Sequence, residues 1–410
     1  MIECFVSATQ LVSKKHYLLM SKPLPFESTT PVLLLVFYKE WLLPRRKEWE
    51  PLSAAAADAG FLAVVATWET LAVEDGVVRA SEVFVRRPES AVFETETDVV
   101  FKPAVVLTTW GTTGYYELFK RIISLGAIST EYSLIAKLDG KCEFECCLRD
   151  YERSTGHSIS RPPTLLSDEL LQGNVSPSDD DFVILKPSRS GKCRGIEIVH
   201  RNSLKALAQE VVDGKRPQFV VQELVSDVFL YNNRRWDIRV NVLATSLSPL
   251  RYCFYPEGVA KTTGAVANPG SIALAEWLNA DSFLEGQHAV ENLPMTEMLD
   301  YIKREYLPLH GFWSQIDAIV GHVFSAIALQ AEKEGFPLKR TFMYPGFDFI
   351  VERDDTAGYK VHLLEINSHP GLGWEPHITA ALRPQYRSWF TELIKMVPSE
   401  ANNVSKTLLV

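Results

Sequence analysis

Cysteine is scarce in this sequence. Six cysteines among 410 residues are too few for a disulfide scaffold. Cys142, Cys146 and Cys147 have no partner Cys or His at the spacing of a zinc finger. We therefore expect reduced thiols with structural roles.

A signal peptide and a membrane span are also lacking from the pattern. The first thirty residues place Lys14, Lys15 and His16 inside their only mildly apolar stretch, so the apolar core of a signal peptide does not form. We expect a cytoplasmic chain. The content of 46% hydrophobic and 23% charged residues provides apolar material for more than one core and excludes a mainly disordered chain.

Basic residues are in the minority. Lys plus Arg total 42 and Asp plus Glu total 51, which gives a formal net charge of -9 at pH 7. This balance argues against binding nucleic acid or an anionic membrane through overall charge. Any site for an anion must therefore be local.

The order of apolar runs and helical patterns predicts an α/β protein. A β-run, a helix and a second β-run begin a small α/β unit that extends to about residue 130, and later runs form further sheets. The expected strands are 31–38, 61–67, 77–87, 181–188, 195–200, 217–224, 344–352 and 359–367, with a long hairpin over 234–263. The expected helices are 46–59, 115–125, 203–212 (capped by Asn202 or Ser203 and ended by Gly214), 313–333 and 378–396.

Two strands late in the chain carry the strongest group of polar side chains. Glu365 and Asn367 lie two residues apart in HLLEIN, so they point to one face of a strand, and the preceding strand GFDFIV can present Asp348 beside them. Oxygen ligands without His or Cys suit a hard cation such as Mg²⁺, with positions left open for phosphate oxygens. An exposed polar strand face is the alternative, but the apolar neighbours in HLLEIN favour a mostly buried strand.

Lys186 ends the apolar run FVILK. A lysine at the end of a buried strand normally needs an anionic partner. The following loop, residues 187–195, contains two glycines, hydroxyl groups and cations, a composition typical of a flexible cover over phosphates. The loop does not match GxxxxGK[ST], so no P-loop is predicted, and a solvated turn explains the loop alone equally well.

The run RWDIRVN at 235–241 has a polar residue at every second position. Arg235, Asp237, Arg239 and Asn241 therefore share one face of a strand. That face is either an outer charged surface or a ligand-facing surface with arginines placed to bind phosphate and carboxylate groups. Lys261, on the paired strand of the hairpin, is able to reach the same surface.

Taken in order, these motifs resemble the ATP-grasp superfamily and, within it, the tubulin–tyrosine ligase-like family. VILKPSRSGKCRGIEIV resembles the lysine strand and glycine flap of that family. The segment from FVVQEL to VAKTT resembles its nucleotide hinge and hairpin, and FMYPGFDFIV and LLEINSHPGL resemble its metal strands. The resemblance covers roughly residues 140 to 385.

The resemblance implies an α/β (α+β) protein with the ATP-grasp fold in three domains. Residues 1–130 would form an N-terminal α/β domain. Residues 131–225 would form the central subdomain with the lysine and the glycine flap. Residues 226–410 would form the C-terminal antiparallel-sheet subdomain with the metal site.

The resemblance also implies a role for each matched residue. Lys186, Arg194 and Gly195 would lie over the ATP phosphates. The adenine hinge and the start of the next strand would complete the nucleotide site with Gln222, Glu223, Leu224, Val225, Arg235 and Asp237, and Lys141 is a further candidate. The acyl-phosphate and the donor substrate would face Arg239 and Lys261, and Mg²⁺ would be bound by Asp348, Glu365 and Asn367.

Two departures from the family pattern concern substrate recognition. Arg235 and Lys261 stand where the family more often has lysine and arginine, respectively, which keeps the charge but changes the geometry of anion binding. The family's His-Leu-Thr-Asn stretch is present only as His288-Ala289-Val290-Glu291-Asn292, and the lysine that usually follows has no clear counterpart.

The residues and the resemblance together predict an ATP- and Mg²⁺-dependent carboxylate–amine ligase that forms an amide through an acyl-phosphate and releases ADP. Its partners would be an amino acid and a peptide or protein, without nucleic acid or membrane. One alternative is a ligase that makes a small peptide or peptide-like metabolite. An alternative of another class is a nucleotide-binding pseudoenzyme, which ADP release stimulated by an amine would exclude.

The charge balance leads to a hypothesis about the acceptor. Most clustered cations of the chain are already assigned to ATP and the donor, so little basic surface remains to attract a strongly acidic partner. We therefore expect a short or weakly acidic peptide, or a metabolite, and we expect tubulin tails to be poor substrates.

Overall fold

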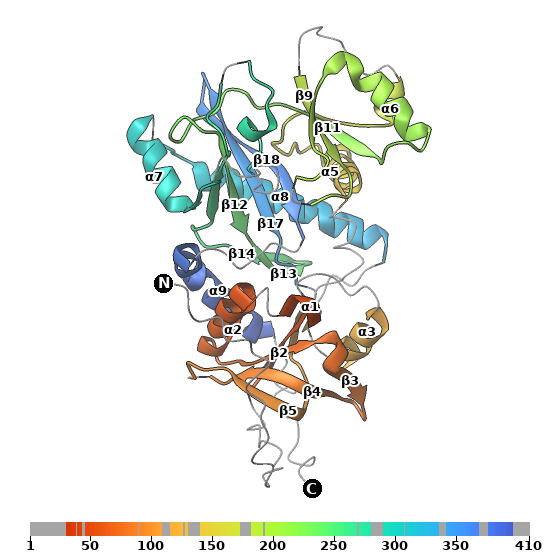
Figure 1. Cartoon of the computed structure of the whole chain (residues 1–410), viewed down its shortest axis with the longest axis vertical. Coiled ribbons are helices and arrows are strands. Elements are labelled where there is room, and N and C mark those ends of the chain that lie inside the picture. The colour runs from red at the N-terminus through yellow and green to blue at the C-terminus, as the bar shows by residue number, and fades with distance from the viewer. Residues whose placement is uncertain are drawn as a thin grey trace, which may run out of the picture.

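The computed structural model describes residues 30 to 396 with several gaps. The gaps are residues 38, 89, 192, 269 and 307 and the ranges 43–45, 109–114, 126–127, 130–139, 173–181, 280–289, 336–341 and 369–375. The described residues form sheets of seven, four, five and two strands. In Figure 1 the seven-stranded sheet lies at the bottom, and the four- and five-stranded sheets lie side by side at the top.

The N-terminal sheet has a parallel centre and an antiparallel edge. Its strands are β1 (Val32–Phe37), β2 (Leu62–Thr67), β3 (Leu71–Glu74), β4 (Val77–Arg86), β5 (Glu94–Phe101), β6 (Val105–Thr108) and β7 (Ile128–Ser129). β1 pairs in parallel with β2 and β6, and all six of its residues are buried, as expected for a parallel strand covered on both faces. The strands predicted at 31–38, 61–67 and 77–87 are confirmed.

Helices cover both faces of this sheet. The odd-numbered residues from Leu33 to Phe37 pack in one core with α2 (Arg46–Asp58), and the even-numbered residues pack in a second core with α3 (Tyr116–Ser124). A short helix, α1 (Lys39–Leu42), precedes α2. Alternation along the strand thus explains why an uninterrupted apolar run is needed here.

The last helix of the chain returns to the N-terminal sheet. α9 (Pro376–Met396) packs beside α2, as Figure 1 shows at the lower left of the molecule. Ile378, Leu382, Tyr386 and Trp389 are buried in the same core as the odd-numbered β1 residues. The two ends of the described chain therefore share one hydrophobic core.

The four-stranded sheet is antiparallel. Its order is β10 (Glu197–His200), β9 (Phe182–Pro187), β11 (Phe219–Glu223) and β8 (Thr164–Leu166). α6 (Leu204–Val212) packs on the face that carries Val183 and Leu185, so Ile184 and Lys186 point to the other face. Gly214, with φ of +70°, follows α6 as predicted, whereas Ser203 makes no cap hydrogen bond from its side chain.

The five-stranded sheet contains both halves of the predicted hairpin. Its order is β16 (Asn292–Pro294), β15 (Val259–Thr262), β12 (Trp236–Asn241), β17 (Gly346–Asp354) and β18 (Gly358–Asn367). The hairpin continues beyond this sheet as the antiparallel pair β13 (Leu243–Leu247) and β14 (Leu250–Cys253). The strands predicted at 344–352 and 359–367 are confirmed, whereas β16 was not predicted.

Three helices contribute to the hydrophobic core behind this sheet. They are α5 (Lys141–Thr155), α7 (Met295–Glu305) and α8 (Phe312–Lys333), and four short 3₁₀ turns complete the described elements, η1 (Trp68–Thr70), η2 (Glu169–Gln172), η3 (Arg201–Ser203) and η4 (Leu274–Glu276). α7 and α8 contact the strands of the sheet, and α5 packs against α8. α8 is long and apolar enough to cross a membrane, but its apolar stripe is buried beneath the sheet, as in the core helix of a globular domain. Ile238 and Val240 point into this core, so Asp237 and Arg239 point to the open face.

Candidate functional site

One face of the five-stranded sheet gathers the charged residues that the sequence singled out. Asp237 is paired with Lys261, Arg239 with Asp348, and Asp348 with Glu365. Residues directly opposite each other in antiparallel strands point to the same face. The strands β15, β12, β17 and β18 therefore bring two cations, Lys261 and Arg239, and three carboxylates, Asp237, Asp348 and Glu365, to one face of the sheet.

A β-bulge places Asp348 beside Glu365. Phe349 is paired with Leu363, but Asp348 is paired with Glu365, so Leu364 is the extra residue in β18. In a regular ladder Asp348 would be opposite Leu364, and Glu365 would point to the other face of the sheet. The bulge is thus required for both carboxylates to share the site.

Arg239 binds the carboxylate of Asp348 in a bidentate ion pair. Its Nε and Nη2 atoms each lie 2.6 Å from a different oxygen. Burial would raise the pKa of Asp348, but the charge and hydrogen bonds of Arg239 outweigh burial and lower it. Burial would lower the pKa of Arg239, but the charge and hydrogen bonds of Asp348 outweigh burial and raise it. Both groups therefore remain charged.

The donor set suits a hard cation. Asp348, Glu365 and Asn367 supply two carboxylates and an amide, and Asn367 Nδ2 lies 3.2 Å from Asp348 Oδ2 and 3.4 Å from Glu365 Oε1. No group of three His, Cys, Asp or Glu is arranged to hold a metal within the described part of the chain. A cation here would therefore use the amide oxygen of Asn367 as its third protein ligand and would share Asp348 with Arg239.

Two lysines approach this face from outside the five-stranded sheet. Lys141, the first residue of α5, has its Nζ atom 3.7 Å from Glu365 Oε2 and donates to the carbonyl of Ser190 at 3.1 Å. Lys186 of β9 is 8% exposed and donates to Gln222 Oε1 at 2.8 Å. Burial lowers the pKa of Lys186, and the nearby charge of Glu365 partly offsets this effect.

Asp237 has an unusual environment for a carboxylate. Asn279 Nδ2 donates to its Oδ2 atom, whereas its Oδ1 atom is buried without a hydrogen-bond partner among the described residues. Burial raises the pKa of Asp237 to about 7, against the opposing effect of Lys261. Burial and the charge of Arg239 lower the pKa of Lys261. A buried carboxyl oxygen that lacks a partner is suited to receive a donor from a bound ligand.

Arg235 is held between the hinge and an aromatic ring. Its guanidinium carbon lies 3.7 Å from the ring centre of Trp277. Its Nη1 atom donates to the carbonyls of Val225 at 3.2 Å and Ser226 at 3.1 Å. The guanidinium that the resemblance assigns to the nucleotide thus contacts protein groups through Nη1 and the Trp277 ring, whereas its buried Nε atom has no hydrogen-bond partner among the described residues.

The other predicted hinge residues are the last two residues of β11, Gln222 and Glu223, and the two that follow it, Leu224 and Val225. Glu223 pairs with Arg201 at 2.5 Å, and its backbone N–H donates to the carbonyl of Pro163. Leu224 packs with Ile184, which is on the same strand face as Lys186. The hinge therefore adjoins the Lys186 side of the central sheet.

The glycine flap connects β9 to β10. Arg194 is exposed and donates from Nε to the carbonyl of Gly191 at 3.3 Å. Gly195 has a φ of +72°, and a Cβ atom there would lie 3.0 Å from Pro187 Cγ. Both conditions favour glycine at this position.

Three neighbours of the site were not among the predicted site residues. Trp277 and Asn279 belong to an irregular segment with no recognisable motif. Asn241 lies on the same strand face as Arg239, is 1% exposed, and has no hydrogen-bond partner for its amide atoms in the described structure. In the stretch 288–292, which differs from the family pattern, residues 288 and 289 lie outside the described residues. Asn292 of β16 is paired with Lys261 of β15.

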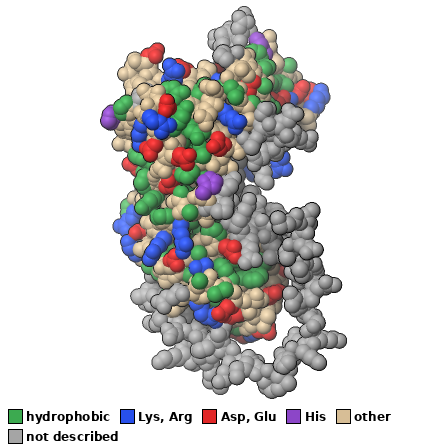
Figure 2. All heavy atoms as spheres, turned by 60° about the vertical axis from the view of Figure 1, so that its left-hand side comes forward, with side chains coloured by type: hydrophobic (Ala, Val, Ile, Leu, Met, Phe, Trp, Pro, Cys, Tyr) green, Lys and Arg blue, Asp and Glu red, His purple; other side chains and the backbone are tan. Residues whose placement is uncertain are grey.

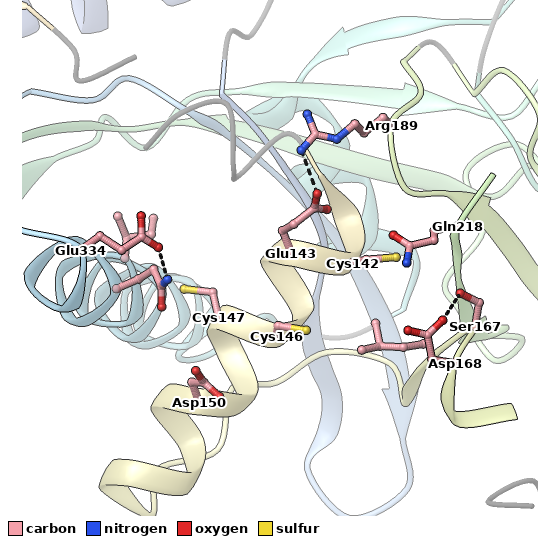
Figure 3. Close-up of a pocket in the computed structure, with 13 residues that line it drawn as sticks. Cys142, Glu143, Cys146, Cys147, Asp150, Ser167, Asp168, Arg189, Gln218 and Glu334 are labelled. Atoms are coloured by element: carbon pink, nitrogen blue, oxygen red, sulfur yellow. Dashed lines mark hydrogen bonds and ion pairs between the residues drawn. The ribbon is translucent and has the colours of Figure 1, made fainter. Parts of the chain in front are cut away.

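A cavity of about 500 Å³ lies apart from these residues, between α5, the end of α8 and the loops after β8 and β9. Figure 3 shows Cys142 and Cys146 of α5 on the side of Ser167 and Asp168. Burial raises the pKa of both thiols. None of the residues predicted for the nucleotide or the metal lines this cavity, so it is not part of the candidate site.

The sequence matches a family model described as "Tubulin-tyrosine ligase family" over residues 164–265 and 285–403, together more than half of the chain. Tubulin glycylase 3B of Tetrahymena thermophila is 24% identical over 208 residues, which cover 48% of this chain and 17% of that protein. Tubulin polyglutamylase TTLL7 of Xenopus tropicalis is 25% identical over 219 residues, covering 48% and 23%, respectively. The chain thus matches less than a quarter of the length of these relatives.

The fold is shared with a solved ligase structure. D-alanyl-alanine synthetase A from Vibrio cholerae superimposes with a TM-score of 0.50 over 90% of this chain and 98% of that one, at 13% identity. At this identity the likeness concerns the fold alone. The mixed α/β arrangement and the ATP-grasp fold are therefore confirmed, whereas the three domain boundaries stay a prediction.

Proposed function

Because the chain belongs to the tubulin–tyrosine ligase family, we propose that it is an ATP- and Mg²⁺-dependent ligase that joins a carboxylate to an amine. One reactant would be an amino acid and the other a peptide or protein. One observation supports this proposal most directly: Asp348, Glu365 and Asn367 share a sheet face with Arg239 and Lys261.

The proposed reaction has two steps. A carboxylate oxygen attacks the γ-phosphorus of ATP, the bond between that phosphorus and the bridging oxygen breaks, and an acyl-phosphate and ADP form. An amine then attacks the acyl carbon, the phosphate leaves, and the amine loses one proton to solvent. Catalysis of this kind depends mainly on positioning and on neutralising phosphate charge.

The residues of the chain divide into three roles. Lys186 and Lys141 would neutralise phosphate oxygens, and Arg239 and Lys261 would hold the anionic acyl-phosphate. Asp348, Glu365 and Asn367 would hold Mg²⁺, which supplies charge neutralisation between phosphate oxygens when bound. Asp237 and Asn241 have buried polar atoms without a hydrogen-bond partner among the described residues.

Amine-dependent turnover tests the proposal. Purified chain would be incubated with ATP, Mg²⁺, single amino acids including glycine, glutamate and tyrosine, and candidate peptides, and products would be identified by intact mass. We expect a mass increase of one amino acid residue and ADP as the spent nucleotide. Stoichiometric AMP would contradict the chemistry, and nucleotide binding without any product would favour a pseudoenzyme.

Paired variants test the residues. Glu365→Gln keeps the shape of the side chain but removes one carboxylate, and Lys186→Met removes a phosphate-binding cation, so each should lose most turnover while remaining folded. Lys360→Met is the matched control, because Lys360 lies exposed on β18, away from the site. Wild-type turnover in Glu365→Gln at saturating Mg²⁺ would exclude the metal assignment.

A further inference from the structure

An irregular segment crosses between the two halves of the candidate site. We call residues 263–279 the strap; all of them except residue 269 are described. The strap begins after β15 beside Arg235, where Thr263 N donates to the carbonyl of Arg235 at 2.8 Å. It therefore starts from the C-terminal sheet.

Internal hydrogen bonds give the strap a defined shape. Glu276 is 8% exposed, and its carboxylate accepts from the backbone N–H of Asn268 at 2.9 Å and from Asn268 Nδ2 at 3.0 Å. Trp277 Nε1 donates to the carbonyl of Ser271 at 2.9 Å. The strap is thus a compact folded loop.

The far end of the strap packs against the central sheet. Leu274 and Leu278 belong to a small apolar cluster with Ile184 of β9, Ile196 of the flap and Leu224 of the hinge. These partners lie on the Lys186 face of β9 and along the predicted adenine hinge. The strap therefore contacts the central subdomain at the edge of the nucleotide site.

Arg235 and Trp277 close the connection between the strap and the hinge. The guanidinium lies 3.7 Å from the centre of the Trp277 ring while Nη1 donates to the carbonyls of Val225 and Ser226. A single side chain thus binds the strap on one side and the hinge backbone on the other. A planar guanidinium can stack flat on a tryptophan ring, which adds stacking to the cation–π attraction, whereas the compact ammonium of lysine cannot stack in this way.

We propose that Arg235 is a positioning residue that, with Trp277, clamps the strap onto the adenine hinge, and that the strap holds the adenosine side of the nucleotide site in place. This inference rests on the proposed nucleotide site. The positioning role stands in place of the direct nucleotide contact that the family resemblance implies for Arg235.

Affinities for ATP, ADP and AMP distinguish the clamp from a phosphate contact. The clamp acts on the hinge, which contacts the adenine that all three nucleotides share. Loss of the clamp therefore weakens the binding of ATP, ADP and AMP by the same factor. Loss of a phosphate-binding cation weakens the binding of ATP more than the binding of AMP, because AMP lacks the β- and γ-phosphates. Lys186→Met, which is assigned to the phosphates, provides the matched comparison.

The experiment measures dissociation constants by isothermal titration calorimetry for the full chain and its variants. The variants are Trp277→Ala, Arg235→Lys, the double variant and Lys186→Met. We expect Trp277→Ala to weaken all three nucleotides about tenfold, the order expected for a desolvated cation–π pair. Arg235→Lys should weaken nucleotide binding by the same factor as Trp277→Ala. The double variant should bind nucleotides no more weakly than either single variant, because both substitutions break the same clamp.

Three results would overturn the inference. Unchanged affinity in a Trp277→Ala chain with wild-type circular dichroism and melting temperature would show that the clamp is dispensable. A loss in Arg235→Lys that grows from AMP to ATP would show that Arg235 contacts phosphate. Absence of nucleotide binding by the wild-type chain would overturn the proposed function together with the inference, whereas the first two results would leave the proposed function intact.

Discussion

At the scale of single residues, the site combines charges that are paired with charges that are not. Arg239 and Asp348 neutralise each other through two short hydrogen bonds, whereas Asp237 has one buried oxygen without a partner among the described residues. Removal of a carboxylate from water without full compensation favours its neutral form. Asp237 therefore lowers the stability of the ligand-free fold when it is ionised.

Asp237→Asn should stabilise the ligand-free chain in a pH-dependent way. The pKa of Asp237 is about 7 in the folded chain, against 3.8 as the ordinary value. The folded state therefore binds a proton that the unfolded state has lost, and stability decreases as pH rises from about 4 to about 7. We expect the melting temperature of Asp237→Asn to exceed that of the wild type at pH 8 and the difference to shrink at pH 5.

Thermal melts without nucleotide or Mg²⁺ measure this effect, and Asp300→Asn is the exposed control. A constant difference between pH 5 and pH 8 would contradict the titration of Asp237. Higher stability with lower turnover in the same variant would indicate that the carboxylate is kept for ligand binding rather than for folding.

At the scale of secondary-structure elements, α5 is held by buried ion pairs. Arg161 donates from Nε and Nη2 to both oxygens of Glu145 at 3.0 Å, and from Nη1 and Nη2 to Glu152 at 2.7 and 2.9 Å. Burial would lower the pKa of Arg161, but the two carboxylates outweigh it and raise the pKa. Since α5 begins at Lys141, this network also positions a candidate ATP-binding residue.

Arg161→Met should destabilise the chain by about 2 kcal/mol, because the buried carboxylate of Glu145 would keep only Arg149 as a partner and Glu152 would lose its guanidinium. Arg153→Met is the control on the same helix. Arg153 is 76% exposed and pairs with Asp150, so its loss should cost about 0.5 kcal/mol or less. Urea denaturation measures both changes, and equal effects of the two variants would contradict a structural role for the buried network.

At the scale of the whole molecule, α9 joins the end of the described chain to its beginning. Trp389 is 4% exposed and lies in the core that also contains β1 and α2. Trp389→Ala should therefore lower the free energy of unfolding by about 3–5 kcal/mol. It should also reduce hydrogen-exchange protection in β1 and β2, far away in sequence, whereas exposed Arg387→Ala on the same helix should not.

Loss of protection limited to α9 would contradict this prediction. It would show that the N-terminal sheet folds independently of the last helix. Joint loss would show that the two ends of the chain unfold as one unit.

The distribution of charge also belongs to the whole molecule. The net charge is -9, and Figure 2 shows acidic and basic side chains interspersed on the face that it presents. We expect a neutral peptide to be modified at least as efficiently as an acidic tubulin-tail peptide, with little dependence on salt. Efficient modification of the acidic peptide that weakens steeply with salt would reveal a basic acceptor groove and contradict this expectation.

The sequence by itself determined the local elements and the faces on which polar residues lie. Period-two placement of Asp237 and Arg239, and of Glu365 and Asn367, requires each pair to share a strand face, because side chains alternate along a strand. Gly214 after α6 and the apolar run of β1 were equally readable, because helix ends and buried parallel strands have local signatures. The motif order was sufficient to indicate the family.

Only the tertiary structure decided how these faces meet. The bulge at Leu364 sets which residue lies opposite Asp348, and strand register depends on packing over the whole sheet rather than on the pattern within one strand. Arg239 and Asp348 are 109 residues apart, and Arg235 meets Trp277 through an irregular segment that has no sequence period. The return of α9 to the N-terminal sheet has the same cause, because an amphipathic helix must bury its apolar face but its sequence does not specify against which partner.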